Sequence, residues 1–325
     1  MKRIYLFASL LLCSMGFVLT GCSDDDLNST SVFAGDTIKA NGEFDKWLTK
    51  NYLETYNIDF QYRYNDKLTD QVYNVIPADD EKSKALAILV KHMWLDAYSE
   101  VFDSIYKRQD PASYYEGKGR NFLKKYCPRQ MQLIGSNEYS PQSIILGTAE
   151  GGLKIMLYGV NRLDIDNPSI NVENPYADRS EVPIDMNYWF FRTMHHEFCH
   201  ILTQQKNYST DYQTITGGSY HSQDWSNLKD TAVAKEGFVT AYASSEYNED
   251  FAEMYATYVT MTPSAWDMIL AKAGPEGSAL LQTKLAAVRA YFSESWNIDI
   301  DEMRAVLLRR SSEAIRLNLR DLNQN

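Results

Sequence analysis

The sequence predicts an α+β fold, in which a small mixed sheet is followed by a mainly helical C-terminal half. The candidate strands are confined to residues 58–160, where residues alternate between apolar and polar or short apolar runs lie beside glycines. Apolar residues recur with helical spacing through most of the chain after residue 184. The 325 residues are 44% hydrophobic and 23% charged, a composition that supports a packed core and excludes wholesale disorder.

The predicted elements follow one another without an internal repeat. Apolar spacing predicts helices at 44–56 and 80–106, and Gly151-Gly152 predicts a hairpin turn within the sheet region. A loop over 161–183 that is rich in Asn, Asp and Pro leads into the helical half, and Pro263 marks a new helix start there. The predicted strands are 58–64, 130–134, 144–147 and 153–158, and the predicted later helices are 184–205, 248–261, 264–273, 276–296 and 300–317.

The first residues have the organisation of a secretory signal. The basic start Met1-Lys2-Arg3 is followed by an almost continuously apolar run that ends in Leu19-Thr20-Gly21-Cys22. This ending resembles the lipobox of bacterial lipoproteins, which implies that residues 1–21 are removed and that Cys22 carries a lipid anchor. The alternative interpretation is an ordinary signal peptide followed by a chance cysteine. Residues 22–40 are rich in Asp, Ser, Thr and Gly and are predicted to form a flexible tether.

Three aspartates follow the candidate lipid anchor directly. The segment Ser23-Asp24-Asp25-Asp26 resembles the acidic export tag of surface lipoproteins in Bacteroidetes-type bacteria, although a solvated linker has the same composition. The resemblance implies a protein anchored to the outer membrane and exposed at the cell surface. The folded domain is expected at 41–325, with an α/β part at 41–165 and a helical part at 166–325.

Charge and cysteine content exclude two other classes of protein. The formal charge is −11 and becomes −13 when Lys2 and Arg3 leave with the signal, so a nucleic-acid partner is not expected. The four cysteines are too few and too scattered for a disulfide framework. Once Cys13 is removed and Cys22 is lipidated, Cys127 and Cys199 remain, and we expect them to be two buried free thiols.

The candidate chemistry begins with the segment His196-Glu197-Phe198-Cys199-His200. Residues four apart lie on the same face of a helix, so the imidazoles of His196 and His200 can bind one Zn²⁺. Glu197 can reach a water at this metal and act as its general base. Only five histidines occur in the chain, which makes a chance occurrence of this spacing uncommon.

A third protein ligand is needed if the zinc is to keep a position open for water. The extended histidine motif of metzincins is excluded, because Thr203 and Lys206 stand where that motif has Gly and His. Glu249 and Glu253 lie four apart on a second predicted helix, so one can bind the metal while the other orients a ligand imidazole. Taken alone, two glutamates at the start of a helix are also typical of a solvent-exposed first turn, where acidic side chains interact favourably with the helix dipole.

The two segments together resemble those of gluzincin metallopeptidases, and most closely the catalytic domain of the anthrax lethal factor type, over about residues 195–255. The second segment also resembles zinc metallopeptidase lipoproteins encoded with nutrient-import systems of Bacteroidetes, the substrate import-associated zinc metallohydrolases. The resemblance implies a zincin-like fold with His196, His200 and Glu249 as metal ligands and Glu197 as general base. It also implies that Glu253 contacts a metal ligand and that Tyr242 supplies a hydroxyl to the transition state.

The remaining histidines are weaker candidates. His195 points about 100° away from His196 around the helix, so we expect it to pack in the core. His92 is expected to pack or to lie on a helix surface. His221, in the irregular stretch 206–240, can line the cleft and contact substrate, although an exposed loop position is the simpler interpretation.

The sequence therefore predicts a zinc-dependent hydrolase, with peptide or protein as the favoured substrate. The alternative is an accessory binding lipoprotein of a TonB-dependent outer-membrane nutrient importer, with a structural zinc that His221 would complete as fourth ligand. A third possibility keeps the zinc chemistry and changes the substrate to another amide, such as one in a cell-wall component.

Overall fold

A computed structural model describes residues 42–65, 75–139, 144–150, 153–179 and 183–324. The predicted signal peptide, Cys22 and the predicted tether lie outside these residues. The described part of Glu43–Asn325 forms one unit with a continuous core. None of the helices in the described ranges combines the length and the apolar character that crossing a membrane requires.

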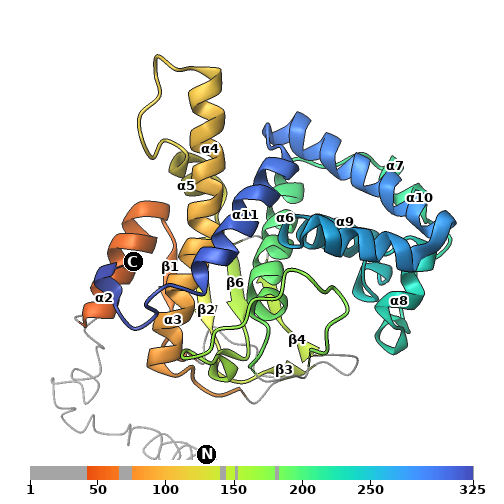
Figure 1. The fold of residues 1–325 in the computed structure, drawn as a ribbon. Helices are drawn as coiled ribbons and strands as arrows, with labels where there is room; N and C mark the ends of the chain where they lie inside the picture. The colour runs from red at the N-terminus through yellow and green to blue at the C-terminus, as the bar shows by residue number, and fades with distance from the viewer. Residues whose placement is uncertain (1–41, 66–74, 140–143, 151–152, 180–182, 325) are drawn as a thin grey trace, which may run out of the picture. The chain divides into compact units, whose positions relative to one another are not determined.

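A small mixed sheet lies in the N-terminal half, as predicted (Figure 1). Its strand order is β1-β2-β6-β5, with β1, β2 and β6 parallel and β5 antiparallel to β6. A separate antiparallel pair consists of β3 and β4. The strands are β1 (Asp59–Gln61), β2 (Gln130–Leu133), β3 (Glu138–Tyr139), β4 (Ile144–Ile145), β5 (Gly147–Glu150) and β6 (Lys154–Leu157).

The prediction of the sheet was partly wrong. The predicted strand at 144–147 is divided, because Ile144 and Ile145 pair with β3 whereas β5 begins at Gly147. The predicted strand 58–64 is limited to Asp59–Gln61. The antiparallel pairing of β5 with β6 agrees with the predicted hairpin, while its turn residues Gly151 and Gly152 lie outside the described residues.

Helices before and between the first strands pack beside the sheet. The first helical stretch is continuous from α2 through a π-helical turn, and the long predicted helix at 80–106 is α3 and α4 joined by another π-helical turn. Asp79 caps α3, since its side chain accepts a hydrogen bond from the backbone N–H of Lys82. These helices are α2 (Glu43–Leu48), α3 (Asp80–Val90), α4 (Asp96–Gln109) and α5 (Arg120–Tyr126), and the π-helical turns are Thr49–Glu54 and Lys91–Leu95.

The second half of the described chain is mainly helical, as predicted. A π-helical turn, Asn187–Phe191, leads into α6 (Arg192–Gln205), which packs against α9 (Tyr247–Thr260). The other helices are α7 (Asp211–Ile215), α8 (Asp230–Val233), α10 (Pro263–Trp296) and α11 (Ile300–Ala314), and the 3-10 turns are Val160–Arg162, Trp225–Asn227, Ala234–Glu236, Tyr242–Ser244 and Leu322–Gln324. Within α10, Gly274 has a φ of 69° and precedes Pro275, so the predicted break between 273 and 276 is confirmed.

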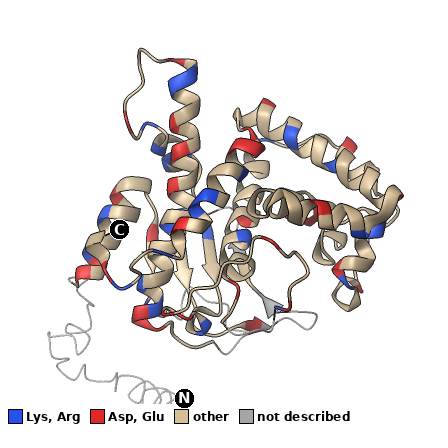
Figure 2. Cartoon of the chain, in the orientation of Figure 1, with Lys and Arg blue, Asp and Glu red and all other residues tan. Residues whose placement is uncertain are grey.

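Ion pairs connect the last long helix, α11, with α4 in the N-terminal half. Arg310 on α11 forms an ion pair with Glu100 on α4 at 2.7 Å, and Arg108 on α4 pairs with Glu302 on α11 at 2.8 Å. Figure 2 shows acidic and basic residues interspersed along both helices. These partly exposed pairs orient the two helices and contribute little stability individually.

The two described cysteines are free and buried, as expected. Cys199 lies on the face of α6 that is turned into the core. On that helix Phe198 packs edge-on against Trp94 and Tyr98, at ring-centroid distances of 5.3 and 4.9 Å. These aromatic contacts fix one side of α6, so the opposite side can face the candidate site.

Candidate metal centre

Helix α6 carries the two candidate ligand histidines, and its start is anchored by polar contacts that are partly buried. Asp185 accepts hydrogen bonds from the backbone N–H groups of Asn171 and Asn187, both at 2.9 Å. The side chain of Asn187 donates to the carbonyls of Asn171 and Thr260. Thr260 ends α9, so these bonds connect the start of α6 to the end of α9. These bonds fix the position of α6 relative to α9 independently of the candidate ligand side chains.

A close approach of the sheet also positions α6. A Cβ atom on Gly147 of β5 would lie 2.6 Å from Cγ2 of Thr193 on α6, a separation that no real side chain tolerates. Glycine at this position therefore allows the strand β5 to lie directly against the helix. The same two residues line the cavity beside the candidate metal ligands.

Helix α9 supplies the two glutamates. This helix begins at Tyr247, its N-cap is Glu246, and no side-chain cap bond forms. Asp250 anchors the first turn instead, through a fully buried ion pair of 2.6 Å with Lys284 on α10. The Lys284 ammonium also donates to the Gly237 carbonyl at 2.8 Å, so the pair is hydrogen-bonded as well as neutralised.

Three candidate ligand atoms converge between α6 and α9. Nε2 of His196 lies 2.9 Å from Oε2 of Glu249 and 3.0 Å from Nε2 of His200, and the His200–Glu249 distance is 3.3 Å. Ligand atoms of a tetrahedral zinc with bonds of 2.0–2.1 Å are about 3.3 Å apart, so the three groups fit this ion. Among the described residues, these three side chains form the one group of three or more His, Cys, Asp or Glu residues whose ligand atoms lie close enough together to hold one metal ion.

The electrostatics of the three groups reflect their mutual contact. Burial alone would raise the pKa of Glu249, but hydrogen bonds from the two imidazoles hold it below its ordinary value. Burial alone would lower the pKa of His196, but hydrogen bonds to Glu249 and Glu253 raise it well above its ordinary value. The carboxylates therefore stabilise positive charge at this point, as a cation site requires.

Glu253 holds the far side of the His196 ring. Its Oε1 accepts from Nδ1 of His196 at 2.9 Å, and its Oε2 accepts from the Thr240 hydroxyl at 2.7 Å. Burial would raise the pKa of Glu253, but the positive charge of Arg192 and these hydrogen bonds lower it to about 2. The carboxylate therefore stays ionised and leaves Nε2 of His196 directed at Glu249 and His200.

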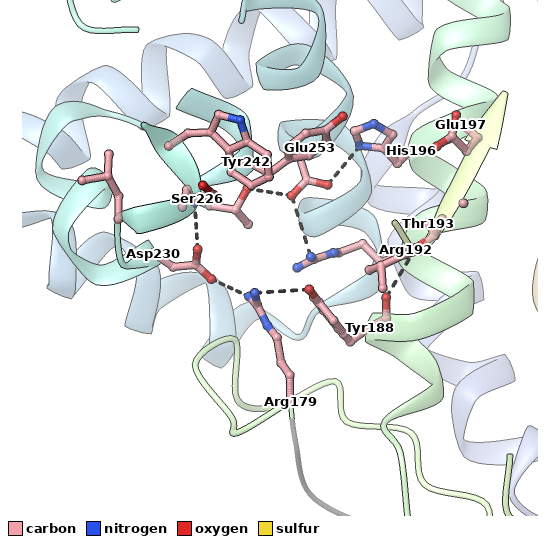
Figure 3. A pocket seen from close by; sticks show the side chains of 16 residues that line it. Arg179, Tyr188, Arg192, Thr193, His196, Glu197, Ser226, Asp230, Tyr242 and Glu253 are labelled. Carbon is pink, nitrogen blue, oxygen red and sulfur yellow. Dashed lines mark hydrogen bonds and ion pairs between the residues drawn. The ribbon is translucent and has the colours of Figure 1, made fainter. Parts of the chain in front are cut away.

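A cavity of about 370 Å³ opens beside this group (Figure 3). Glu197 and His196 line it from α6, and Tyr242 lines it from the 3-10 turn before α9. Burial raises the pKa of the Glu197 carboxyl above its ordinary value. A carboxylate with a raised pKa, adjacent to a cation site and facing a cavity, is suited to take up a proton.

Tyr242 is also placed at the cavity. Its ring lies 5.8 Å from the ring of His196 and 4.9 Å from that of Trp225, measured between centroids, and the residue is 39% exposed. Burial and the charge of Glu249 raise the pKa of its hydroxyl above the ordinary value. The hydroxyl therefore remains protonated and able to donate a hydrogen bond.

The structure does not bring His221 to the candidate ligands. Its Nε2 forms a hydrogen bond with Oε2 of Glu236 at 2.7 Å, and His221 is not among the described residues that line the cavity. The hypotheses that made it a fourth ligand or a substrate contact therefore lack support from the geometry. His195 is fully buried, with Nδ1 at 3.4 Å from the Tyr98 hydroxyl, and burial lowers its pKa to about 3.

Much of the cavity wall was missed by the sequence analysis. Tyr188 and Arg192 belong to the π-helical turn and first turn before the histidines, and Arg179 and Asp230 come from segments predicted to be irregular. The spacing of Arg192 and His196, four residues on one helix, was a signal that could have identified the first of them. No comparable signal marks Arg179, whose ion pair with Asp230 joins residues 51 apart in the chain.

Comparisons with known proteins identify a family and a similar solved structure. The chain matches the family described as "putative zinc-binding metallo-peptidase" over residues 37–301. It is similar to the crystal structure of a "putative zinc-binding metallo-peptidase" from Bacteroides caccae, with 38% sequence identity, a TM-score of 0.67, and coverage of 88% of this chain and 98% of that one. A comparison with curated proteins found no match. The family match spans most of the chain, so the protein belongs to this zinc-binding metallo-peptidase family.

Proposed function

We propose that the protein is a zinc-dependent peptidase of the gluzincin type with a zincin-like fold. The observation that carries this proposal is the convergence of His196, His200 and Glu249 beside a cavity into which Glu197 faces. Three protein ligands leave a tetrahedral zinc one further position, which is the arrangement of catalytic sites.

Each residue then has a distinct role. A zinc ion held by the three ligands would supply Lewis acidity that polarises a carbonyl and lowers the pKa of water. Glu197 accepts the proton of the attacking water and returns it to the leaving nitrogen. The Tyr242 hydroxyl donates a hydrogen bond to the oxyanion that develops on the scissile carbonyl. Glu253 holds the tautomer and orientation of His196.

The test is the substitution Glu197→Gln, which keeps the size of the side chain and removes its basicity. We expect hydrolysis of a peptide library to fall by at least about 100-fold, because general-base catalysis contributes that much, while bound zinc stays stoichiometric. The matched control is Glu294→Gln, at an exposed position of α10, which should leave both quantities unchanged. Normal hydrolysis by the Glu197 variant, or hydrolysis that survives removal of zinc by a chelator, would contradict the proposal.

The geometry does not favour a closed structural site. Such a site needs a fourth protein ligand, and the candidate for it, His221, is engaged with Glu236. We therefore do not retain the hypothesis of a binding protein with structural zinc. The bond that is hydrolysed is proposed to be a peptide bond on the strength of the family description.

We also propose that the protein is lipid-anchored through Cys22 to the outer membrane, exposed at the cell surface and associated with a nutrient importer. The anchor and the surface location rest on the Leu19–Cys22 sequence and on the three aspartates that follow it, and the importer association rests on the resemblance of the segment with Glu249 and Glu253 to lipoproteins encoded with nutrient-import systems. We expect the full chain to fractionate with membranes and to be digested by protease added to intact cells. Cys22→Ser should move it to the soluble fraction, whereas Cys127→Ser should not; a membrane-bound Cys22→Ser protein would overturn the anchor.

A further inference from the structure

Arg192 is a largely buried guanidinium whose hydrogen-bonding capacity is unused. Its side chain is 12% exposed, and its nearest charged partner is Oε2 of Glu253 at 3.8 Å, which is beyond hydrogen-bond distance. Within the described part of the chain, no acceptor lies within hydrogen-bond distance of its N–H groups. A guanidinium carries five N–H donors, and no nitrogen of Arg192 is among the described atoms that are both buried and without a partner, so its donors reach the cavity and are open to water. A ligand that brings its own acceptor into the cavity can replace this water.

The position of this guanidinium connects it with the candidate metal centre. Arg192 lies one turn before His196 on the same face of α6, and both residues line the cavity. In Figure 3 its guanidinium points into the space between Glu253 and Tyr188. The Arg192 guanidinium also lies over the Tyr188 ring, 4.8 Å from the ring centroid. This cation–π contact holds the side chain in this orientation.

A second arginine faces the same space from a different segment. Arg179 lines the cavity and stacks on the same Tyr188 ring at 4.2 Å. It is fixed by an ion pair with Asp230, and Asp230 in turn accepts a hydrogen bond from the backbone N–H of Ala241 at 2.8 Å. Two guanidinium groups therefore approach one aromatic ring from two elements, and both are preorganised by protein contacts.

Three carboxylates line the cavity, and none of them is within hydrogen-bond distance of Arg192: Glu197 forms no described ion pair with it, and Glu253 and Asp230 have other partners. Both oxygens of Glu253 already accept hydrogen bonds, one from His196 and one from Thr240. Asp230 already forms an ion pair with Arg179 and accepts a hydrogen bond from the backbone N–H of Ala241. The unused donors of Arg192 therefore face the open volume in which a substrate would lie.

We propose that Arg192, assisted by Arg179, binds a carboxylate of the substrate beside the scissile bond. The proposal rests on the peptidase function proposed above, and it names the substrate class as peptides that are negatively charged at this point. Arg192 lies one helical turn, about 5.4 Å along α6, from the candidate metal ligand His196. An extended peptide advances about 3.3 Å per residue, so the carboxylate is expected within about two residues of the bond that is cleaved. It can be an acidic side chain or a free C-terminal carboxylate, because an arginine fork recognises both in the same way.

The first test compares peptides that differ in one carboxylate. One pair has Glu or Gln flanking the cleaved bond, with an amidated C-terminus in both, and a second pair has a neutral sequence with a free or an amidated C-terminus. We expect the wild-type protein to prefer the charged member of at least one pair by about tenfold or more in kcat/KM, through a lower KM. The pair that shows the preference identifies the source of the carboxylate. No preference in either pair would overturn the proposal.

Variants then assign the preference to the residue. In Arg192→Gln the ratio of kcat/KM between charged and neutral peptides should fall to about one, and Arg192→Lys, which keeps the charge without the fork, should give an intermediate ratio. Arg162→Gln is the matched control, since Arg162 also stacks on an aromatic ring, that of Trp189, outside this cavity. It should keep the wild-type ratio. Zinc content is measured in each variant, so that an indirect effect through Glu253 is recognised. A wild-type ratio in zinc-loaded Arg192→Gln would contradict the assignment.

A binding measurement separates this inference from the proposed function. Calorimetric titration of Glu197→Gln with the same peptide pairs requires no turnover, and we expect the charged peptide to bind about tenfold more tightly. This difference should disappear in the double variant Glu197→Gln/Arg192→Gln. If the wild-type protein cleaves no peptide and yet the difference in binding is found, the peptidase proposal fails and the carboxylate site stands. Equal binding of both peptides would reject the carboxylate site whatever the outcome for catalysis.

Discussion

At the scale of single residues, the candidate site depends on a carboxylate that does not touch the metal position. Glu253 accepts a hydrogen bond from His196 Nδ1 and is held by Thr240, so it determines which nitrogen of His196 faces Glu249 and His200. Removing such a partner typically weakens metal binding by about 10- to 100-fold. Because the ligand itself remains, the effect should appear in affinity rather than in the number of bound ions.

The substitution Glu253→Gln tests this dependence. Gln can still accept a hydrogen bond from the imidazole, but it loses the negative charge that strengthens His196 as a ligand. We expect the dissociation constant of zinc, measured by competition with a chelating indicator, to rise about 10- to 100-fold. Glu276→Gln, at an exposed position on α10, should bind zinc as tightly as the wild-type protein. An unchanged zinc affinity in the Glu253 variant would mean that its contact with His196 has no influence on the metal.

At the scale of elements, local patterns identified helices well and strand limits poorly. The spacing of His196 and His200 placed both on one helical face, and the predicted gap between the helices 264–273 and 276–296 matches the interruption at Gly274 in α10. Helical spacing is a property of neighbouring residues, so it can be read locally. The division between β4 and β5 could not be read in this way, because Ile144 and Ile145 pair with β3 and Gly147 begins the pairing with β6. Strand limits depend on partners that are distant in sequence.

The same distinction explains which parts of the candidate site were predicted. His196, Glu197 and His200 lie within one helical turn, and Glu249 and Glu253 lie within another, so two local patterns identified five residues. The cavity wall is assembled differently: Arg179 comes from a loop and Asp230 from a short helix, and only tertiary packing brings them to Tyr188. For His221 the sequence left both a cavity position and a loop position open, since its partner Glu236, fifteen residues further along the chain, could not be read from a local pattern.

At the scale of the whole molecule, the candidate ligands join elements that are otherwise connected by packing and by contacts at their ends. Helix α6 supplies His196 and His200, and α9 supplies Glu249, after an intervening stretch that contains only short helices. A zinc ion bound by all three would therefore oppose separation of α6 from α9. A ligand that binds the folded state alone stabilises it by RT ln(1 + [L]/Kd), or about 4 kcal/mol when free zinc is 1,000 times the dissociation constant.

Thermal unfolding in buffered zinc measures this coupling. Above saturation, each tenfold increase in free zinc should add about 1.4 kcal/mol to the free energy of unfolding, so Tm should rise steadily with the logarithm of zinc concentration. His200→Ala removes one ligand and should shift this rise to much higher zinc concentrations. His92→Gln is the matched control: His92 lies on the turn between α3 and α4, bonded to the Arg310 carbonyl, and its loss should leave the zinc-dependent slope intact. A wild-type Tm that does not respond to zinc would show that the three side chains do not bind this ion in the folded protein, and the proposed peptidase mechanism would fail with them.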